Sequence, residues 1–125
     1  MSPKKIYSID TGMLTLNSAS FSSDQGRLLE NAVFLHLKRN GDEVFYFKGL
    51  KECDFITRSN NGTLAAFQVC HILNDDNMKR ELSGLVEALD ILKLDQGLII
   101  TSDQTDQFIV DGKEINVVPA WKWMS

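Results

Sequence analysis

The sequence has few cysteines, few prolines and no long apolar run. Its 125 residues include two prolines and two cysteines, Cys53 and Cys70. These cysteines lack the paired C-x-x-C spacing of a zinc site, and we expect both to be reduced thiols. No stretch approaches the roughly 20 apolar residues of a membrane helix, and no signal-peptide core follows the N-terminus. These absences predict a cytoplasmic protein that makes no membrane contact.

An excess of basic charge is also absent. The chain has 13 Lys and Arg residues against 17 Asp and Glu residues, which gives a net charge of −4. Because nucleic-acid binding depends largely on clustered Lys and Arg, this balance argues against a dedicated nucleic-acid coat while leaving DNA binding open. With 43% hydrophobic and 24% charged residues, the chain fits one globular domain with a single core.

The apolar pattern predicts two long helices. Apolar side chains recur at helical spacing through residues 24–40, and Gly41 follows as a stop signal. From Met78 to Leu92 they fall at i, i+4, i+7, i+8, i+11 and i+14, which is one face of a second helix. We therefore expect each helix to pack one apolar face against the rest of the domain.

The remaining segments indicate strands and turns. Strand-like runs cover residues 4–9, 43–48, 52–58, 63–71, 97–101, 107–110 and 113–118. Asn61-Gly62 and Asp111-Gly112 are typical of tight hairpin turns. The prediction is a single α/β domain over residues 1–125, with a lead-in strand and loop (1–23), a core (24–101), and a hairpin and tail (102–125).

This order of elements carries a first resemblance. A core of helix, three-strand meander, helix and strand resembles the restriction-endonuclease-like, or PD-(D/E)XK, nuclease fold, here with an added C-terminal β-hairpin. That family places a glutamate in the first helix, an aspartate in the second meander strand and an acid-x-lysine pair in the third. The matching positions are Glu30, Asp54, Gln68 and Cys70.

The family's chemistry explains why these positions must converge. Mg²⁺ needs several oxygen ligands, and a water beside it must be activated to attack the phosphodiester. Residues two apart on a strand point to one face, so side chains 68 and 70 can meet Asp54 across the neighbouring strand. We expect the site on one face of the sheet, near the first helix.

A second resemblance covers nearly the whole chain. Four sequence segments resemble, in order, those of a C-terminal domain of unknown function that follows the AAA-type ATPase module of bacterial and archaeal ATPases. The segments span residues 3–12, 26–34, 51–56 and 119–123. The resemblance implies that the chain is a C-terminal fragment of a longer ATPase. Because the chain has no G-x-x-x-x-G-K-S/T loop, ATP would bind in an N-terminal module, which is the expected partner of this domain.

The departures from the nuclease pattern decide the functional hypothesis. A neutral amide at Gln68 is a poor Mg²⁺ ligand, and the thiol of Cys70 has neither the charge nor the donors of a lysine. Glu30 and Asp54 remain as matched carboxylates and would hold Mg²⁺ or Mn²⁺ weakly at best. We therefore expect vestigial nuclease positions in an accessory domain, regulatory or substrate-recognising, that does not cleave DNA and holds no other cofactor.

Two other functions stay open at this stage. The domain could be an active Mg²⁺- or Mn²⁺-dependent DNA nuclease that draws extra ligands from Glu52, Asp75 or Asp76. It could also be a nucleic-acid-binding module without catalysis. Glu30 could be an ordinary solvated carboxylate, and Asp54 part of a salt bridge near a turn.

Ordinary structural roles are also open for three other residue types. Cys70 fits a half-buried strand position. His71 should point to the opposite face of its strand, which argues against a Cys70–His71 catalytic pair. Trp121 and Trp123 either cover the domain's own core or mark a contact with a partner.

Overall fold

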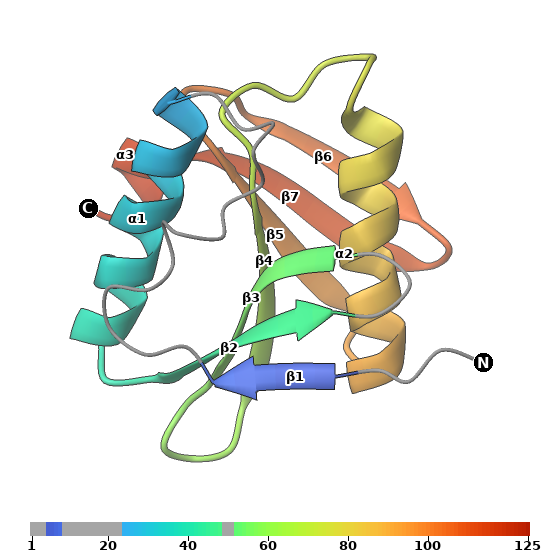
Figure 1. Cartoon of the computed structure of the whole chain (residues 1–125). Coiled ribbons are helices and arrows are strands. Elements are labelled where there is room, and N and C mark those ends of the chain that lie inside the picture. Colours follow the sequence, from blue (N-terminus) through green and yellow to red (C-terminus); the bar gives the residue numbers. More distant parts are fainter. Residues whose placement is uncertain (1–4, 9–23, 49–51) are drawn as a thin grey trace.

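The computed structural model describes residues 5–8, 24–48 and 52–125, with residues 5–8, 24, 47–48 and 52–54 described by their backbone alone. The elements, in chain order, are β1 (Lys5–Ser8), α1 (Asp24–Arg39), β2 (Glu43–Lys48), β3 (Glu52–Arg58), β4 (Leu64–Val69), α2 (Met78–Leu92), β5 (Gln96–Thr101), β6 (Asp106–Val110), β7 (Lys113–Pro119) and α3 (Ala120–Trp123) (Figure 1). The expected lead-in loop lies outside the described residues.

The observed helices and strands match the predicted ranges to within three residues at their ends. One difference is α3, which was expected as an irregular tail. Pro119 has an extended backbone (φ −76°, ψ 142°) and no N–H, so it ends β7. The next residues close a helical turn in which the Met124 N–H donates to the carbonyl of Ala120.

The strands form one mixed sheet of seven strands in the order β1-β2-β3-β4-β5-β7-β6. Neighbours from β1 to β4 are antiparallel, β4, β5 and β7 run parallel, and β6 returns antiparallel to β7. The predicted C-terminal hairpin is confirmed as β6 with β7. Because β7 inserts beside β5, this hairpin extends the sheet and leaves β6 as its last strand.

Helices cover both faces of the sheet, which gives a three-layer α/β arrangement (Figure 1). On one face, α1 and the short α3 pack in a core cluster that includes Val33 and Phe55. On the other face, α2 packs in a second cluster, where Leu85 meets Ile56 and Ile99. None of the helices in the described part of the chain has the length and apolar character that crossing a bilayer requires.

Strand β4 divides its side chains between these two layers. Phe67 and Val69 pack in the cluster under α1, whereas Ala66 and Cys70 pack in the cluster under α2. Alternation along a strand places Gln68 on the same face as Ala66 and Cys70. The predicted sharing of a face is confirmed, and it is the α2 face.

Strand β5 forms the apolar centre of the domain. Ile99 and Ile100 are both 0% exposed because helices cover both faces of this strand. Gly97 allows α2 to approach closely: a Cβ atom there would lie 2.9 Å from Leu89 Cδ1 and 3.0 Å from Leu85 Cδ2. The absence of a side chain at Gly97 therefore fixes how closely α2 sits on the sheet.

The aromatic residues at the end of the chain have different environments. The Trp123 ring lies 4.8 Å from the ring of His36 and 5.7 Å from that of Phe67, measured between centroids. Trp123 therefore covers the domain's own core. Trp121 is 65% exposed, and its Nε1 donates to Oδ1 of Asp103 at 3.0 Å.

Candidate functional site

The candidate site begins at the C-terminal end of β4, at the end of the molecule where both long helices start (Figure 1). Gln68 is 5% exposed there and forms a side-chain hydrogen bond with Glu81 of α2. Burying an amide requires such a partner, because an unsatisfied polar group costs about 1–3 kcal/mol. The neutral side chain of Gln68 is therefore held against a carboxylate from the second helix.

Glu81 joins this site because α2 turns it inward. It lies in the first helical turn, three and four residues before the buried Gly84 and Leu85, so it shares their face. Burial raises the pKa of the Glu81 carboxyl. The hydrogen bond from Gln68 and the positive charge of Arg80 act in the opposite direction and lower that pKa.

Glu30 brings a second carboxylate to the site from α1. Its side chain is half-buried, and this burial, together with the negative charge of Glu81, raises its pKa from the usual 4.5 to about 7. Near neutral pH the Glu30 carboxyl is thus partly protonated. Because the negative charge of Glu81 raises the pKa of Glu30, the two carboxyls lie close enough to interact. One comes from each helical layer.

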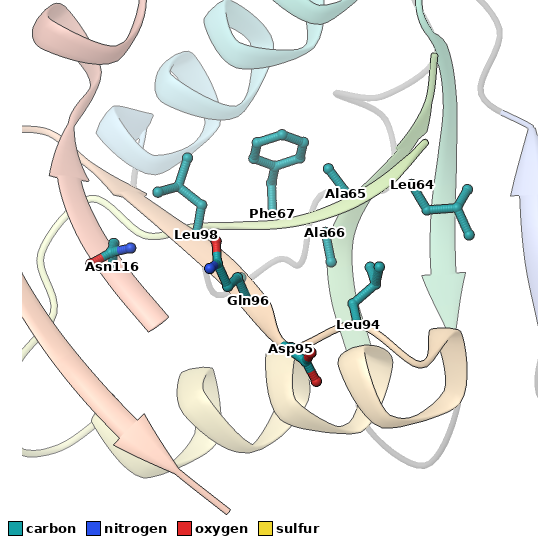
Figure 2. Close-up of a pocket in the computed structure, with 10 residues that line it drawn as sticks. Leu64, Ala65, Ala66, Phe67, Leu94, Asp95, Gln96, Leu98 and Asn116 are labelled. Carbon is teal, nitrogen blue, oxygen red and sulfur yellow. The ribbon is translucent and has the colours of Figure 1, made fainter. Parts of the chain in front are cut away.

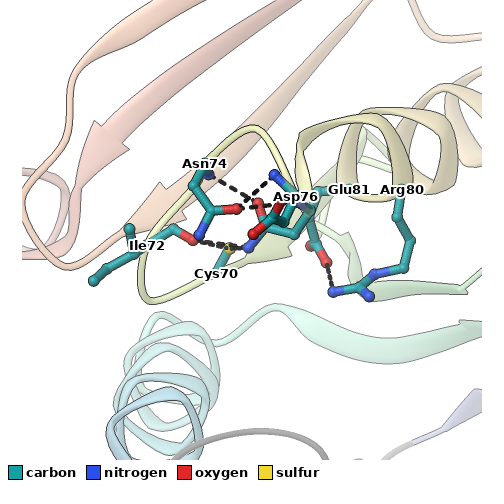
Figure 3. A network of polar contacts seen from close by, with 7 residues as sticks. Cys70, Ile72, Asn74, Asp76, Arg80 and Glu81 are labelled. Atoms are coloured by element: carbon teal, nitrogen blue, oxygen red, sulfur yellow. Dashed lines mark hydrogen bonds and ion pairs between the residues drawn. The ribbon is translucent and has the colours of Figure 1, made fainter.

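Cys70 belongs to a hydrogen-bonded loop that links β4 to α2 (Figure 3). Its Sγ donates to the carbonyl of Ile72 at 3.1 Å and accepts from Nδ2 of Asn77 at 3.5 Å. Asn74 Oδ1 accepts the N–H groups of Asp76 and Asn77, both within 3.1 Å. The thiol of Cys70 therefore serves this local network.

His71 does not form a catalytic pair with Cys70. Its Nδ1 contacts Oγ of Ser102 at 2.5 Å, and its carbonyl accepts the Ser102 N–H at 3.1 Å. The two residues follow the parallel strands β4 and β5 and tie the ends of these strands together. The His71 ring therefore has a hydrogen-bond partner at the end of the neighbouring strand. This agrees with the expectation that His71 does not pair with Cys70.

Asp54 is placed by its strand alone, because its side chain lies outside the described residues. In the antiparallel ladder of β3 and β4, Phe55 is opposite Phe67. One further step along both strands leads to Asp54 and Gln68. The backbone register is therefore compatible with the predicted approach of these two positions.

The other carboxylates considered from the sequence are exposed or lie outside the described side chains. Asp75 and Asp76 are exposed in the loop before α2, and the side chain of Glu52 lies outside the described residues. Gln68 and Cys70 lie on the face that α2 covers, whereas Glu30 comes from α1, the helix near which the site was expected. Period-two alternation groups side chains on one face, but it does not determine which helix covers that face.

Sequence reasoning missed Glu81. The available signal was a carboxylate on the apolar face of a predicted helix, one turn before Leu85. Such a position is unusual, because glutamate is seldom buried without a partner. Identifying the partner as Gln68 requires knowing how α2 is rotated over β4, which is a property of the tertiary structure.

The described side chains do not fit a Mg²⁺ centre. No group of three or more His, Cys, Asp or Glu side chains converges among the described side chains, residues 25–46 and 55–125. Gln68 already bonds Glu81, and burial favours the neutral forms of Glu30 and Glu81. Mg²⁺ requires charged oxygen ligands, so protons compete with the metal at these carboxyls.

An open hollow of about 470 Å³ lies elsewhere, at the opposite ends of the parallel strands (Figure 2). It lies where β4 and β5 begin, with Phe67, Leu98 and Asn116 in its lining. Asp95 is the one titratable residue that lines it. A mixed polar and apolar lining with a single carboxylate offers no acid–base pair, so the candidate site stays at the polar end of β4.

The fold and site thus define an α/β domain with a mixed sheet between two helical layers and a buried polar cluster at one end. A comparison with models of known protein families finds no match. The chain is 41% identical over 134 aligned positions to the uncharacterized protein MJ1544 of Methanocaldococcus jannaschii. The alignment covers 98% of this chain, which spans about 30% of the length of that relative.

Proposed function

We propose that this chain is a restriction-endonuclease-like accessory domain of a larger, AAA-type ATPase, and that it has lost nuclease activity. The single observation that carries the loss of activity is Gln68. It occupies the acid position of the nuclease pattern, is 5% exposed, and bonds Glu81. A water-activating metal centre has no charged ligand at this position.

The nuclease-like architecture is supported by the order of elements. The core runs α1, β2, β3, β4, α2, β5, with the antiparallel meander β2-β3-β4 followed by the parallel neighbour β5. A domain that keeps this fold but lacks the charged acid and lysine of the nuclease pattern is consistent with a binding or regulatory role. Function depends on the site and not on the fold alone.

The larger protein is supported by the length of the relative. A match over 30% of MJ1544 leaves most of that protein for other segments. The sequence phrases that resemble the ATPase-associated domain supply the expected neighbour. The coding sequence that adjoins this chain tests the proposal: an in-frame G-x-x-x-x-G-K-S/T loop upstream supports the ATPase context, and its absence contradicts it.

Loss of nuclease activity is tested by incubating the chain with single-stranded, duplex and branched DNA in Mn²⁺. We expect all three substrates to remain intact. Cleavage that disappears in Asp54→Ala would contradict the proposal. Calorimetry adds a gain-of-function test, because Gln68→Glu with Cys70→Lys should acquire Mn²⁺ binding, whereas the exposed control Gln96→Glu should not.

Glu81 favours one competing function. A carboxylate from α2 that reaches Gln68 could replace the missing strand acid and, with Asp54, form a displaced nuclease centre. This function predicts Mn²⁺-dependent cleavage that is lost in Glu81→Gln. The raised pKa of Glu81 argues for the inactive domain, and the cleavage assay separates the two functions.

A further inference from the structure

Strand β6 presents main-chain groups at the edge of the sheet. The turn at residues 111–112 has two successive positive φ angles, 51° and 80°, which is the tight two-residue hairpin geometry. In such a hairpin Val110 bonds its partner across the turn, and bonded pairs then alternate along β6. Gln107 and Ile109 therefore direct their N–H and C=O groups away from β7. The N–H of Gln107 bonds Oδ1 of Asp106 at 2.8 Å.

The side chain of Ile109 is strongly exposed at this edge. It is 75% exposed, more than any other large hydrophobic side chain in the described part of the chain. Natural edge strands are usually protected by charges, bulges or prolines because they can template another strand. In β6 the residue at this position is hydrophobic: Ile109 exposes its side chain and directs its main-chain N–H and C=O outward.

A hollow lies beside this edge on the α2 side. It measures about 400 Å³ and is bounded by α2 and the end of β6. Val86, Ile91 and Val110 supply its apolar lining, and Glu87, Asp90 and Asp111 its carboxylates. Side chains of a strand added next to β6 would alternate in direction, so every second one would point toward this hollow.

The charge around the hollow identifies the chemistry of a partner. No Lys or Arg lines it. Lys113, at the base of the hairpin, is engaged by the Leu94 carbonyl at 2.7 Å and by Asp90 at 3.5 Å. A second copy of the chain would bring its own Asp106 and Asp111 to the same edge, and like charges disfavour that pairing.

We propose that the β6 edge and the adjoining hollow form a docking site for an extended, basic peptide segment. The segment adds a strand to the sheet through main-chain hydrogen bonds at Ile109 and at the carbonyl of Gln107, whose N–H bonds Asp106. An apolar side chain of the segment fills the hollow against Ile91 and Val110, and flanking Lys or Arg residues bring positive charge to the acidic rim that includes Asp111. This site is separate from the Gln68 cluster and does not depend on the proposed function.

Fluorescence anisotropy with synthetic peptides tests the proposal. The probe has an alternating Val-Thr-Ile-Thr-Val core with two lysines at each end. One control replaces the lysines with glutamates, and a second replaces the central isoleucine with proline. We expect binding of the lysine probe that weakens with added salt, and no binding of either control.

Two protein variants separate strand addition from general attraction. Ile109→Pro removes an outward N–H at an edge position where proline is tolerated, and it should weaken binding about tenfold or more. Ile109→Thr keeps the N–H and should bind within about threefold of the unaltered chain. Circular dichroism establishes that both variants are folded.

A second pair of changes covers the case in which Ile109→Pro does not fold. Glu87→Gln with Asp111→Asn preserves shape, and asparagine accepts the positive φ at position 111. This variant should weaken the lysine probe and reduce its salt dependence. Equal binding of the glutamate peptide, unaltered binding by the variant, or self-association abolished by Ile109→Pro would each overturn the proposal.

Discussion

The apolar centre of the domain and the polar end of β4 differ in how burial of their side chains affects stability. At the centre, Ile99 and Ile100 are fully buried among close-packed side chains. At the polar end, Gln68 and two carboxyls are buried or half-buried, and the pKa values of both carboxyls are raised by burial. The centre therefore stabilises the fold, whereas the polar end costs free energy at neutral pH. Such a cost at one end of a sheet is typical of an inherited functional site.

The largest expected effect comes from breaking the centre. Ile99→Ala should lower the free energy of unfolding by about 2–5 kcal/mol, because the surrounding side chains cannot fill the cavity. Chemical denaturation measures this loss. The matched control is Ile109→Ala on the exposed edge, which should change stability by no more than about 0.5 kcal/mol. Equal effects of the two changes would contradict the assignment of the core.

Adding volume at the centre should have a smaller effect. Gly97→Ala puts a Cβ atom 2.9 Å from Leu89 Cδ1 and 3.0 Å from Leu85, so α2 or these side chains must shift. We expect a loss of about 1–3 kcal/mol in the same denaturation assay. Gln96→Ala, at the exposed neighbour, is the control. A stabilised Gly97→Ala variant would show that the helix can move away at no cost.

The polar end should instead respond to pH. The pKa of Glu30 is about 7 in the folded chain and 4.5 in its usual state, so between these values the folded state binds more protons. Stability should therefore fall as pH rises from about 4.5 to about 7 and stay level above that range. Glu30→Gln removes the part of this fall that Glu30 causes, and at pH 8 it should stabilise the domain by on the order of 1 kcal/mol, after allowance for solvent screening.

Thermal unfolding across pH 4–8 measures this contrast. Glu81→Gln sharpens it, because removing the neighbouring negative charge should lower the pKa of Glu30 and shift the transition to lower pH. A pH profile of Glu30→Gln that matches the unaltered chain would contradict the burial of this carboxyl.

The smallest expected effect is at Cys70. Its Sγ bonds the carbonyl of Ile72, and a serine hydroxyl can donate the same bond. Cys70→Ser should change the free energy of unfolding by less than about 1 kcal/mol. A loss as large as that of Ile99→Ala would show that the packing of Cys70 against the cluster under α2 outweighs its hydrogen bond to the loop.

Features that depend on local sequence were predictable. Met78–Leu92 and the turn at residues 111–112 were predictable because helical periodicity and positive-φ residues act locally. The continuous apolar run of β5 likewise indicated a strand covered on both faces. The same-face grouping of Gln68 with Cys70 followed from strand alternation.

The partners at the polar end were not predictable. The contact of Glu81 with Gln68 depends on the rotation of α2, and the raised pKa of Glu30 depends on packing between layers. Neither quantity is encoded by spacing within one element. The tertiary structure is therefore most informative for polar residues that are buried although their helix or strand pattern does not explain the burial.

Near neutral pH we expect protons to compete successfully with Mg²⁺ for the Glu30 carboxyl at the polar end of β4. An NMR titration of the Glu30 carboxyl carbon, with and without Mg²⁺, tests this claim most directly. We predict a pKa near 7 that Mg²⁺ does not change. A pKa that Mg²⁺ depresses by a unit or more would show that the metal competes with the proton and would contradict the claim.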